Sequence, residues 1–365
     1  MRSIGINAVG IGIASIIFLA FSVVFDIPFG ILADRWSRKG VLIVSAFALA
    51  ICSVLMGISN GLLLYCVAEV FYGIFLVSTS GTYNAITYDI LHEEGRANQY
   101  SKVSGRMYAL FLVAAGIANV GSGFIANRFG FRLAFYVTVI SCIVNVLVLL
   151  TLHEPKFHKL EQAGGFIKQL KQGSGVLANN RLLRLLATVF SAFAIVDLFC
   201  SEFGQLYALR YVSSVQLLGI IWAIYAFCWA FGSFIAHHFR ARLTLVVIFA
   251  TVPLILMAFV DDWFSLVFFM VQVIAAAIVV NQTETRVQEN TPSSIRASVM
   301  SVLTTMGQLV SIPASLLMGW LIQHYDVMWA LRFVAILGGL TLLYWLWASR
   351  GIPKSDVPVV ANILP

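Results

Sequence analysis

The sequence predicts an all-α membrane protein with about eleven transmembrane helices. Of its 365 residues, 60% are hydrophobic and only 11% are charged, whereas a soluble domain carries about 25% charged residues. The mean hydropathy is +0.93. Apolar segments of about 20 residues or more recur along the chain and do not alternate in polarity as the strands of a membrane barrel would. Because backbone polar groups must be paired inside lipid, we expect these segments to be helices.

The predicted spans form a group of five and a group of six, separated by a polar stretch. The first group covers residues 6–32, 40–58, 61–90, 101–127 and 133–152; the second covers 182–210, 215–237, 243–260, 263–285, 294–323 and 327–348. We therefore predict an N-terminal bundle over residues 1–152, a cytoplasmic linker over 153–181, a six-helix bundle over 182–350 and a cytoplasmic tail over 351–365. A short amphipathic helix is expected in the linker, near residues 166–170.

The distribution of basic residues predicts the orientation in the membrane. Most of the 23 lysines and arginines fall in the loops of one side, which include the first loop, the linker and the C-terminal segment. The positive-inside rule places these segments in the cytoplasm and the N-terminus outside. The net charge of +7 is explained by these loops, so we do not expect a nucleic-acid partner.

The sequence contains no pattern typical of an enzyme or a metal protein. Its cysteines all lie inside apolar segments and form no CxxC pair, so we expect small buried side chains and no disulfide, metal or cofactor site. The cysteines are Cys52, Cys66, Cys142, Cys200 and Cys228. There is also no phosphate-binding loop and no nucleophile elbow.

A charged segment separates the first two predicted spans. It carries the pattern Gly-x-x-x-Asp-Arg-x-x-Arg-Lys, which consists of Gly30, Asp34, Arg35, Arg38 and Lys39. An acid and three bases in so short a turn are typical of a cytoplasmic hinge between two membrane helices.

A faint internal repeat relates the two groups of spans. Residues 232–242 resemble residues 30–39, and residues 290–296 resemble residues 93–96 at nearly the same spacing. The span over residues 182–210 then has no counterpart ahead of the first predicted span. We therefore expect a six-plus-six architecture from which the first helix is missing.

The hinge pattern, the two groups of spans and the basic linker together resemble the major facilitator superfamily. The resemblance implies two six-helix bundles around a central cavity that opens to each side of the membrane in turn, and transport of small solutes, often coupled to protons. Ser37 stands where the family usually has glycine. Glu69, four residues before Gly73, stands where the family usually has arginine. The pattern formed by Glu69, Ser80-Gly81 and Tyr88-Asp89 resembles the pattern of an efflux-like bacterial branch of this family.

The hinge residues are expected to act as a gate. The resemblance implies that Asp34 contacts the other half of the protein when the inner gate is shut, and residues 291–294 offer a suitable helix start. Arg35, Arg38 and Lys39 are candidates to pair with Asp89 or Glu93, and Arg106 is a second candidate partner of Asp89. The alternative interpretation is a basic loop that only sets the topology.

Several polar side chains lie inside apolar spans, where an acid costs about 2.5–3.5 kcal/mol at mid-bilayer. Glu69 is either a protonatable cavity group or an interhelical anchor. Asp197 and Glu202 lie five residues apart, which is about 140° apart on a regular α-helix, so we expect them to face different ways. Asp197 is the deeper candidate cavity residue.

Further candidates are Asp26 as an interfacial acid, Asn281 in a polar series along the ninth span, and Gly116, Gly121 and Gly123 as sites of close helix approach.

These observations predict a monomeric secondary transporter of the bacterial inner membrane that works by alternating access. Its expected partners are a small-molecule substrate, the lipid bilayer and protons. The preferred function is proton-coupled efflux of hydrophobic or cationic compounds. The alternatives are import of a sugar, organic acid or peptide, and a truncated remnant or sensor that transports nothing.

Overall fold

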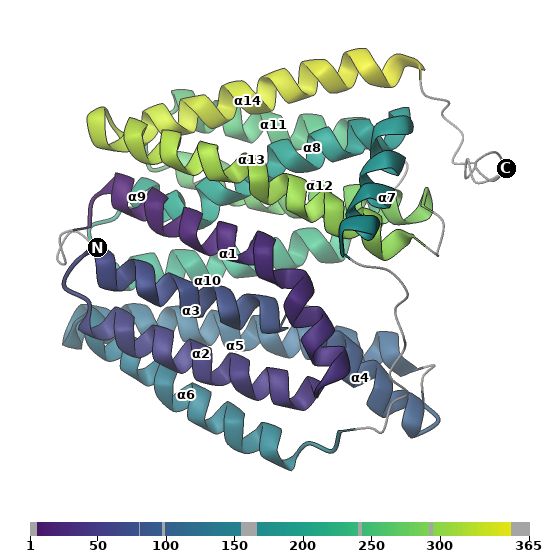
Figure 1. The fold of residues 1–365 in the computed structure, drawn as a ribbon. Helices are drawn as coiled ribbons and strands as arrows, with labels where there is room; N and C mark the ends of the chain where they lie inside the picture. Colours follow the sequence, from purple (N-terminus) through teal and green to yellow (C-terminus); the bar gives the residue numbers. More distant parts are fainter. Residues whose placement is uncertain are drawn as a thin grey trace, which may run out of the picture. The chain divides into compact units, whose positions relative to one another are not determined.

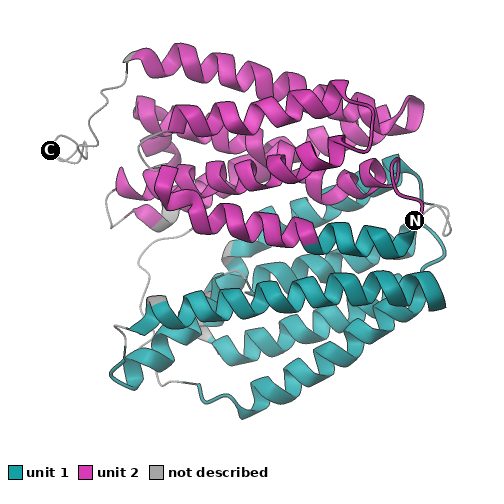
Figure 2. Ribbon diagram, turned by 180° about the vertical axis from the view of Figure 1, so that it is seen from behind, with its two compact units in different colours: residues 1–163, 214–223 teal, residues 164–213, 224–365 magenta. Residues whose placement is uncertain are grey.

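The computed structural model describes residues 6–79, 81–96, 99–154, 166–239, 243–291 and 295–351 (Figure 1). These residues form helices and connecting turns without a strand. Ten segments are long and apolar enough to cross a membrane, and one further apolar helix, α11, has 17 residues. The predicted all-α membrane architecture is therefore confirmed. The chain divides into two compact units (Figure 2): unit 1 contains Met1–Ala163 and Ser214–Ala223, and unit 2 contains Gly164–Ser213 and Ile224–Pro365.

Unit 1 is built around α2. This helix packs against α3 and α6, while α1 packs against α3, and α5 packs against α6. A small core of Leu42, Ile86 and Leu149 joins α2, α4 and α6. The helices of the unit are α1 (Ala8–Arg35), α2 (Arg38–Ile58), α3 (Leu62–Thr79), α4 (Thr82–Glu93), α5 (Tyr100–Phe129) and α6 (Phe131–Thr151).

Unit 2 is built around α11 and α8. α11 packs against α12 and α14, α13 packs against α14, and α8 packs against α12, α13 and α14. The helices are α7 (Phe166–Asn179), α8 (Arg181–Leu198), α9 (Gly204–Ala208), α10 (Val215–Ile235), α11 (Leu243–Phe259), α12 (Ser265–Glu289), α13 (Arg296–His324) and α14 (Val327–Ala348). Short irregular turns are η3 (Phe199–Phe203), η4 (Ala236–Phe239) and η5 (Ser349–Gly351). The first part of α10 belongs to unit 1.

The linker helix is longer than predicted. α7 has 14 residues, although Gly173 and Gly175 disfavour a helix interior. It packs against α13 and α8 and lies across their ends (Figure 1). Arg184 donates from Nη1 to the carbonyl of Ala178 near the end of α7 at 2.7 Å. This contact with a helix C-terminus is favourable for a cation, and packing therefore extends a helix that propensity alone would shorten.

The same packing pattern occurs in both units. The contacts of α2 with α3 and α6 correspond to those of α11 with α12 and α14, and the α5–α6 contact corresponds to that of α13 with α14. This correspondence is the structural form of the repeat seen faintly in the sequence.

The span predicted as one helix over residues 61–90 is broken into α3 and α4. The prediction of one span is confirmed, because Leu62–Glu93 is a single candidate membrane span. Its helix is not continuous, because Gly81 adopts φ +70°, a left-handed conformation that interrupts a right-handed helix. Interrupted helices at membrane depth are typical of sites where the backbone is covered by protein or water.

One predicted glycine contact is confirmed. A Cβ atom on Gly123 of α5 would lie 2.9 Å from the Cα atom of Gly219 in the first part of α10, so the two backbones touch. Cβ atoms on Gly116 and Gly121 would meet nothing within 4 Å. These two glycines therefore make no close helix contact among the described residues.

Replacing Gly81 tests the break. We expect Gly81→Ala to destabilise the protein by about 1–2 kcal/mol, because the added Cβ strains a left-handed residue, although it would meet no atom within 4 Å. Gly61→Ala is the matched control, since its Cβ also enters open space but its φ is not positive. Thermal unfolding in detergent measures both. Equal midpoints for the two variants would contradict the strain argument.

Candidate functional site

An ion pair joins α2 to α4 in unit 1. The Arg38 guanidinium contacts the Asp89 carboxylate, and the two side chains are largely withdrawn from solvent. The predicted pairing of a hinge base with Asp89 is thus confirmed for Arg38, while Arg106 is exposed. Asp89 reaches Arg38 because the break at Gly81 starts a new helix, α4, which packs against α2.

Glu154 binds the start of α2, and sequence reasoning missed it. The Ser37 hydroxyl donates to Glu154 Oε2 at 2.6 Å, and the Lys39 backbone N–H donates to Oε1 at 3.2 Å. Ser37 Oγ also accepts the Gly40 N–H at 2.7 Å. A carboxylate is stabilised at a helix N-terminus, and an acid just beyond the fifth predicted span was the available signal. Ser37, which departs from the family's glycine, is therefore the N-cap of α2.

Lys39 fixes the end of α6 to the same place. Its ammonium group donates to the carbonyls of Leu150 and Leu152, both at 2.8 Å. These carbonyls lie at the C-terminal end of α6, where a cation is favourable. The hinge bases therefore have two different partners: Arg38 holds α4, and Lys39 holds α6.

The remaining hinge residues are only partly described. Gly30 is exposed, and a Cβ atom there would meet nothing within 4 Å. The side chains of Asp34 and Arg35, together with residues 80, 240–242 and 292–294, lie outside the described residues. The latch between Asp34 and residues 291–294 therefore stays a prediction.

Glu69 is buried within unit 1 on α3. One turn later, a Cβ atom on Gly73 would lie 2.8 Å from the ring of Phe21 on α1, and the Tyr72 ring lies 5.5 Å from that of Phe18. Cys52 of α2 is within electrostatic range of Glu69. A position among three packed helices favours the interpretation of Glu69 as an interhelical anchor.

Asp197 precedes an irregular turn in unit 2, and Glu202 lies within that turn. Residues Phe199–Phe203 form a π-helical turn between α8 and α9. The regular α-helix on which the 140° separation was based is therefore not present. Hydrogen bonds in a π-turn join residues i and i+5, which brings positions five apart toward the same face, and such turns occur frequently at functional sites. Glu202 lies within electrostatic range of Asp197.

Tyr225 is the aromatic side chain that the structure relates to both acids, of which Asp197 is partly buried and Glu202 is exposed. Tyr225 of α10 lies within electrostatic range of both Asp197 and Glu202. Its ring is 6.0 Å from that of Phe269 on α12. One turn along α12, Gln272 is fully buried, and neither polar atom of its side chain has a hydrogen-bond partner among the described residues.

Asn281 has a structural role in the described part of unit 2. Its amide donates to Ser233 Oγ at 3.1 Å and to the Ala277 carbonyl at 2.8 Å. The neighbouring Gln282 donates to the Ala236 carbonyl. Asn281 therefore attaches α12 to the end of α10, and Gln282 attaches α12 to η4. The sequence alone did not distinguish this structural role from a role in the cavity.

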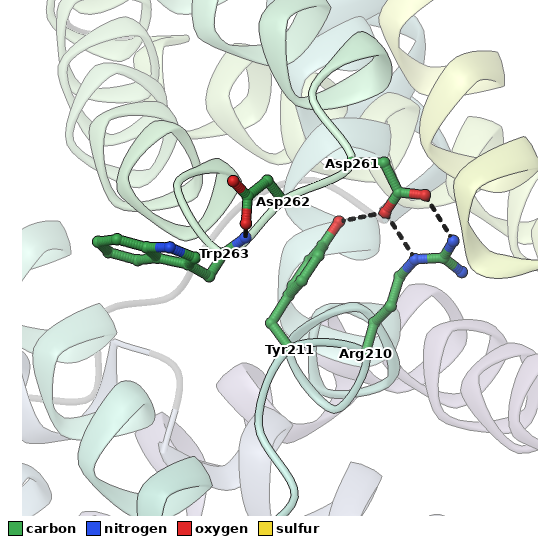
Figure 3. Close-up of a pocket in the computed structure, with 5 residues that line it drawn as sticks. All are labelled: Arg210, Tyr211, Asp261, Asp262 and Trp263. Atoms are coloured by element: carbon green, nitrogen blue, oxygen red, sulfur yellow. Dashed lines mark hydrogen bonds and ion pairs between the residues drawn. The ribbon is translucent and has the colours of Figure 1, made fainter.

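A third polar group joins three loops of unit 2. Arg210 donates from Nη2 to Asp261 Oδ2 at 2.7 Å and from Nε to Oδ1 at 2.9 Å, and it also contacts Asp326. The Tyr211 hydroxyl donates to Asp261 Oδ1 at 3.1 Å. Arg210, Tyr211 and Asp261 border an open cavity of about 480 Å³, together with Asp262 and Trp263 (Figure 3).

Hydrogen bonding to Arg210 holds the pKa of the Asp261 carboxyl below its ordinary value, and the bond to Asp261 raises the pKa of Arg210. Asp326 also caps α14, because its Oδ1 accepts the Val327 N–H at 2.6 Å. No role was assigned to Arg210 from the sequence. The signal that was missed is the presence of an acid, Asp261 or Asp326, in each of two other short loops.

Breaking the Arg38–Asp89 pair tests its contribution. We expect Asp89→Asn to destabilise the protein by about 3 kcal/mol, because it leaves a largely buried guanidinium without its counter-charge. Glu94→Gln, which breaks the exposed pair of Glu94 with Arg96, is the control and should cost less than about 1 kcal/mol. Denaturant unfolding in detergent measures both, and similar losses would refute the assignment.

The Arg210–Asp261 pair predicts a pH dependence. A carboxyl whose pKa is lower in the folded than in the unfolded state contributes stability above its unfolded pKa of about 4. That contribution is lost as the pH falls through the folded pKa. Between about pH 5 and pH 3, the thermal midpoint of the native protein should therefore fall further than that of Asp261→Asn. Parallel midpoints in the two proteins would show that the pair does not stabilise the fold.

Comparisons with known proteins agree with this architecture. Residues 1–315 match the Major Facilitator Superfamily. The chain is 30% identical over 145 residues to an uncharacterized transporter of Buchnera aphidicola subsp. Schizaphis graminum, which covers 40% of this chain and 36% of that protein. It is 28% identical over 179 residues to the inner membrane transport protein YajR of Escherichia coli. That match covers 48% of this chain and 37% of YajR. These matches thus span little more than a third of each relative.

Solved structures show the same fold over almost the whole chain. The nucleoside transporter NupG matches with a TM-score of 0.76 and 17% identity, covering 96% of this chain and 92% of that one. A D-xylose–proton symporter matches with a TM-score of 0.73 and 13% identity, and the match covers 98% of this chain and 90% of the symporter. With the family match over most of its length, this multi-pass membrane protein belongs to the Major Facilitator Superfamily.

Proposed function

We propose that the protein is a proton-coupled transporter that exports amphipathic cations, with Asp197 and Glu202 exchanging protons for the solute. The observation that supports the proposal is the π-turn of unit 2, which contains Glu202 and follows Asp197 in the same membrane span, with Tyr225 within electrostatic range of both acids. A second acid close to the first makes the pair hard to ionise fully, since like charges disfavour each other.

The energetic cost of an ionised acid inside a membrane span leads to the exchange of a proton for a cation. A carboxylate inside an apolar span is costly unless it is protonated, paired or facing water. A proton and an organic cation therefore compete for the same negative charge, and binding of one favours release of the other. The rings of Tyr225 and Phe269 lie 6.0 Å apart, and aromatic faces attract cations within about 6 Å. An aromatic cluster with two acids thus suits a cation with an apolar body.

The gate in this proposal lies at the start of α2. The hinge residues Gly30, Asp34, Arg35, Arg38 and Lys39 would close the inner side when the site opens outward. Arg38–Asp89 and Lys39 with the end of α6 would then hold α2, α4 and α6 together as one moving body. We place the protein in the bacterial inner membrane as a monomer with its C-terminus in the cytoplasm. The basic loops and the inner membrane location named for YajR support this placement.

Import of an uncharged, hydrogen-bonding solute is the second candidate. The buried Gln272 amide has no hydrogen-bond partner among the described residues, and an unpaired buried amide is costly. A sugar or nucleoside hydroxyl would satisfy it. The similarity to a nucleoside transporter and to a D-xylose–proton symporter supports this alternative.

Flux measurements in proteoliposomes test the proposal. We expect Asp197→Asn and Glu202→Gln each to lower solute-dependent proton flux at least about tenfold, a barrier change of about 1.4 kcal/mol. Glu94→Gln removes an exposed acid and is the matched control. A lipophilic cation, a pentose and a nucleoside are supplied in parallel.

The outcomes separate the candidates. Flux with the cation alone supports export, and flux with the pentose or nucleoside, abolished by Gln272→Leu, supports import instead. Unchanged flux in both acid variants would refute the role of Asp197 and Glu202. No flux with any solute would favour a remnant or sensor.

A further inference from the structure

Two fully buried hydroxyl groups of unit 2 make no direct hydrogen bond to any described residue. They belong to Tyr207 of α9 and to Ser265, the first residue of α12, and each residue is 0% exposed. A buried tyrosine hydroxyl usually has a hydrogen-bond partner, and a buried polar group without one destabilises the fold. These two hydroxyls therefore require an explanation.

The two hydroxyls belong to one group of side chains. Ser265 lies close enough to Tyr207 and to Tyr211 to act on the hydroxyl groups of both. The rings of the two tyrosines meet edge to face, with centroids 5.5 Å apart and planes at 79°. Ser265 is held at this place by the turn before α12, where its N–H donates to the Asp262 carbonyl at 2.8 Å. We call Tyr207, Tyr211 and Ser265 the hydroxyl cluster.

The hydroxyl cluster extends from the apolar interior of unit 2 to solvent. On the inner side, the Tyr207 ring lies 5.8 Å from the ring of Phe269 and 6.4 Å from that of Phe199, and neither ring carries a polar atom. On the other side, Tyr211 borders the open cavity of about 480 Å³, and its hydroxyl donates to Asp261 Oδ1 at 3.1 Å (Figure 3). Water in this cavity therefore reaches one member of the cluster directly.

The hydrogen-bonding capacity of the cluster fits one water molecule. A hydroxyl group donates one hydrogen and accepts up to two. Tyr211 gives its hydrogen to Asp261, so its oxygen remains an acceptor. A buried water molecule typically makes about three hydrogen bonds. It can accept the hydrogen of Tyr207 and donate its own two hydrogens to the oxygens of Tyr211 and Ser265.

We propose that the hydroxyl cluster binds one ordered water molecule. Polar groups that lie near one another without a direct hydrogen bond are commonly bridged in this way. The water satisfies both buried hydroxyls and joins Tyr207, in the interior, to Asp261 at the cavity. Every donor in the chain from Tyr207 through the water and Tyr211 then points toward the Asp261 carboxylate, which favours its charged form. This site is independent of the proposed proton exchange at Asp197 and Glu202.

Hydroxyl-radical footprinting of the reconstituted protein tests the site. X-ray pulses generate the radicals from water molecules themselves, so a bound water oxidises the side chain beside it, and mass spectrometry locates the oxidised residue. We expect oxidation of Tyr207 in spite of its 0% exposure. Phe193 of α8, an aromatic residue that is 1% exposed, is the control in the same spectrum and should remain intact.

Variants identify the residues that hold the water. Ser265→Ala should lower the oxidation rate of Tyr207 about fivefold, as the loss of one of the water's hydrogen bonds would produce. Tyr211→Phe removes a different partner and should have a similar effect, so the test does not depend on one variant. Ser191→Ala, at a buried serine of α8 outside the cluster, is the matched control and should leave the rate unchanged.

Two results would overturn the proposal. Protection of Tyr207 equal to that of Phe193 in the native protein would show that no water lies beside its ring. An oxidation rate of Tyr207 that is the same in the native protein, Ser265→Ala and Tyr211→Phe would show that solvent reaches the ring without being held by the cluster.

Discussion

The fold depends on one constraint: every backbone polar group inside lipid must find its partner within the protein. This forces helices wherever the chain is apolar, and it makes each interruption of a helix costly. Two interruptions occur inside predicted spans, at Gly81 and at the π-turn Phe199–Phe203. The first starts α4 and lets Asp89 meet Arg38, and the second contains Glu202, five residues after Asp197 in the same span. The functional geometry therefore arises where the regular helix fails.

The sequence predicted what depends on composition and on local spacing. The apolar runs predicted the helices, and the hinge pattern predicted the pair of Arg38 with Asp89, because bases and acids on one side of a membrane have few other partners. The break at Gly81 was not predictable, since nothing distinguishes this glycine in sequence from others inside helices. The π-turn was missed because a shift from i+4 to i+5 bonding leaves no trace in polarity. The Arg210–Asp261–Asp326 group was missed because its members lie in three separate loops.

The two units use their polar groups differently. In unit 1, the described charges mostly hold helices in place, as Arg38, Lys39 and Glu154 do around the start of α2. Glu69 lies among three packed helices in the same way. In unit 2, Arg210 and Asp326 hold the loops together, and the proposed proton exchange is placed instead at Asp197 and Glu202. In the proposed mechanism, stability and proton exchange thus depend on different charges of the same chain.

The central claim is that Asp197 takes up and releases a proton within the membrane. Infrared spectroscopy of the reconstituted protein tests it most directly, through the C=O stretching band of protonated carboxyl groups recorded as pH is cycled. The account predicts a band that changes reversibly with pH, diminishes in Asp197→Asn and shifts when a lipophilic cation is added. A spectrum that is identical in the native protein and in Asp197→Asn at every pH would contradict it.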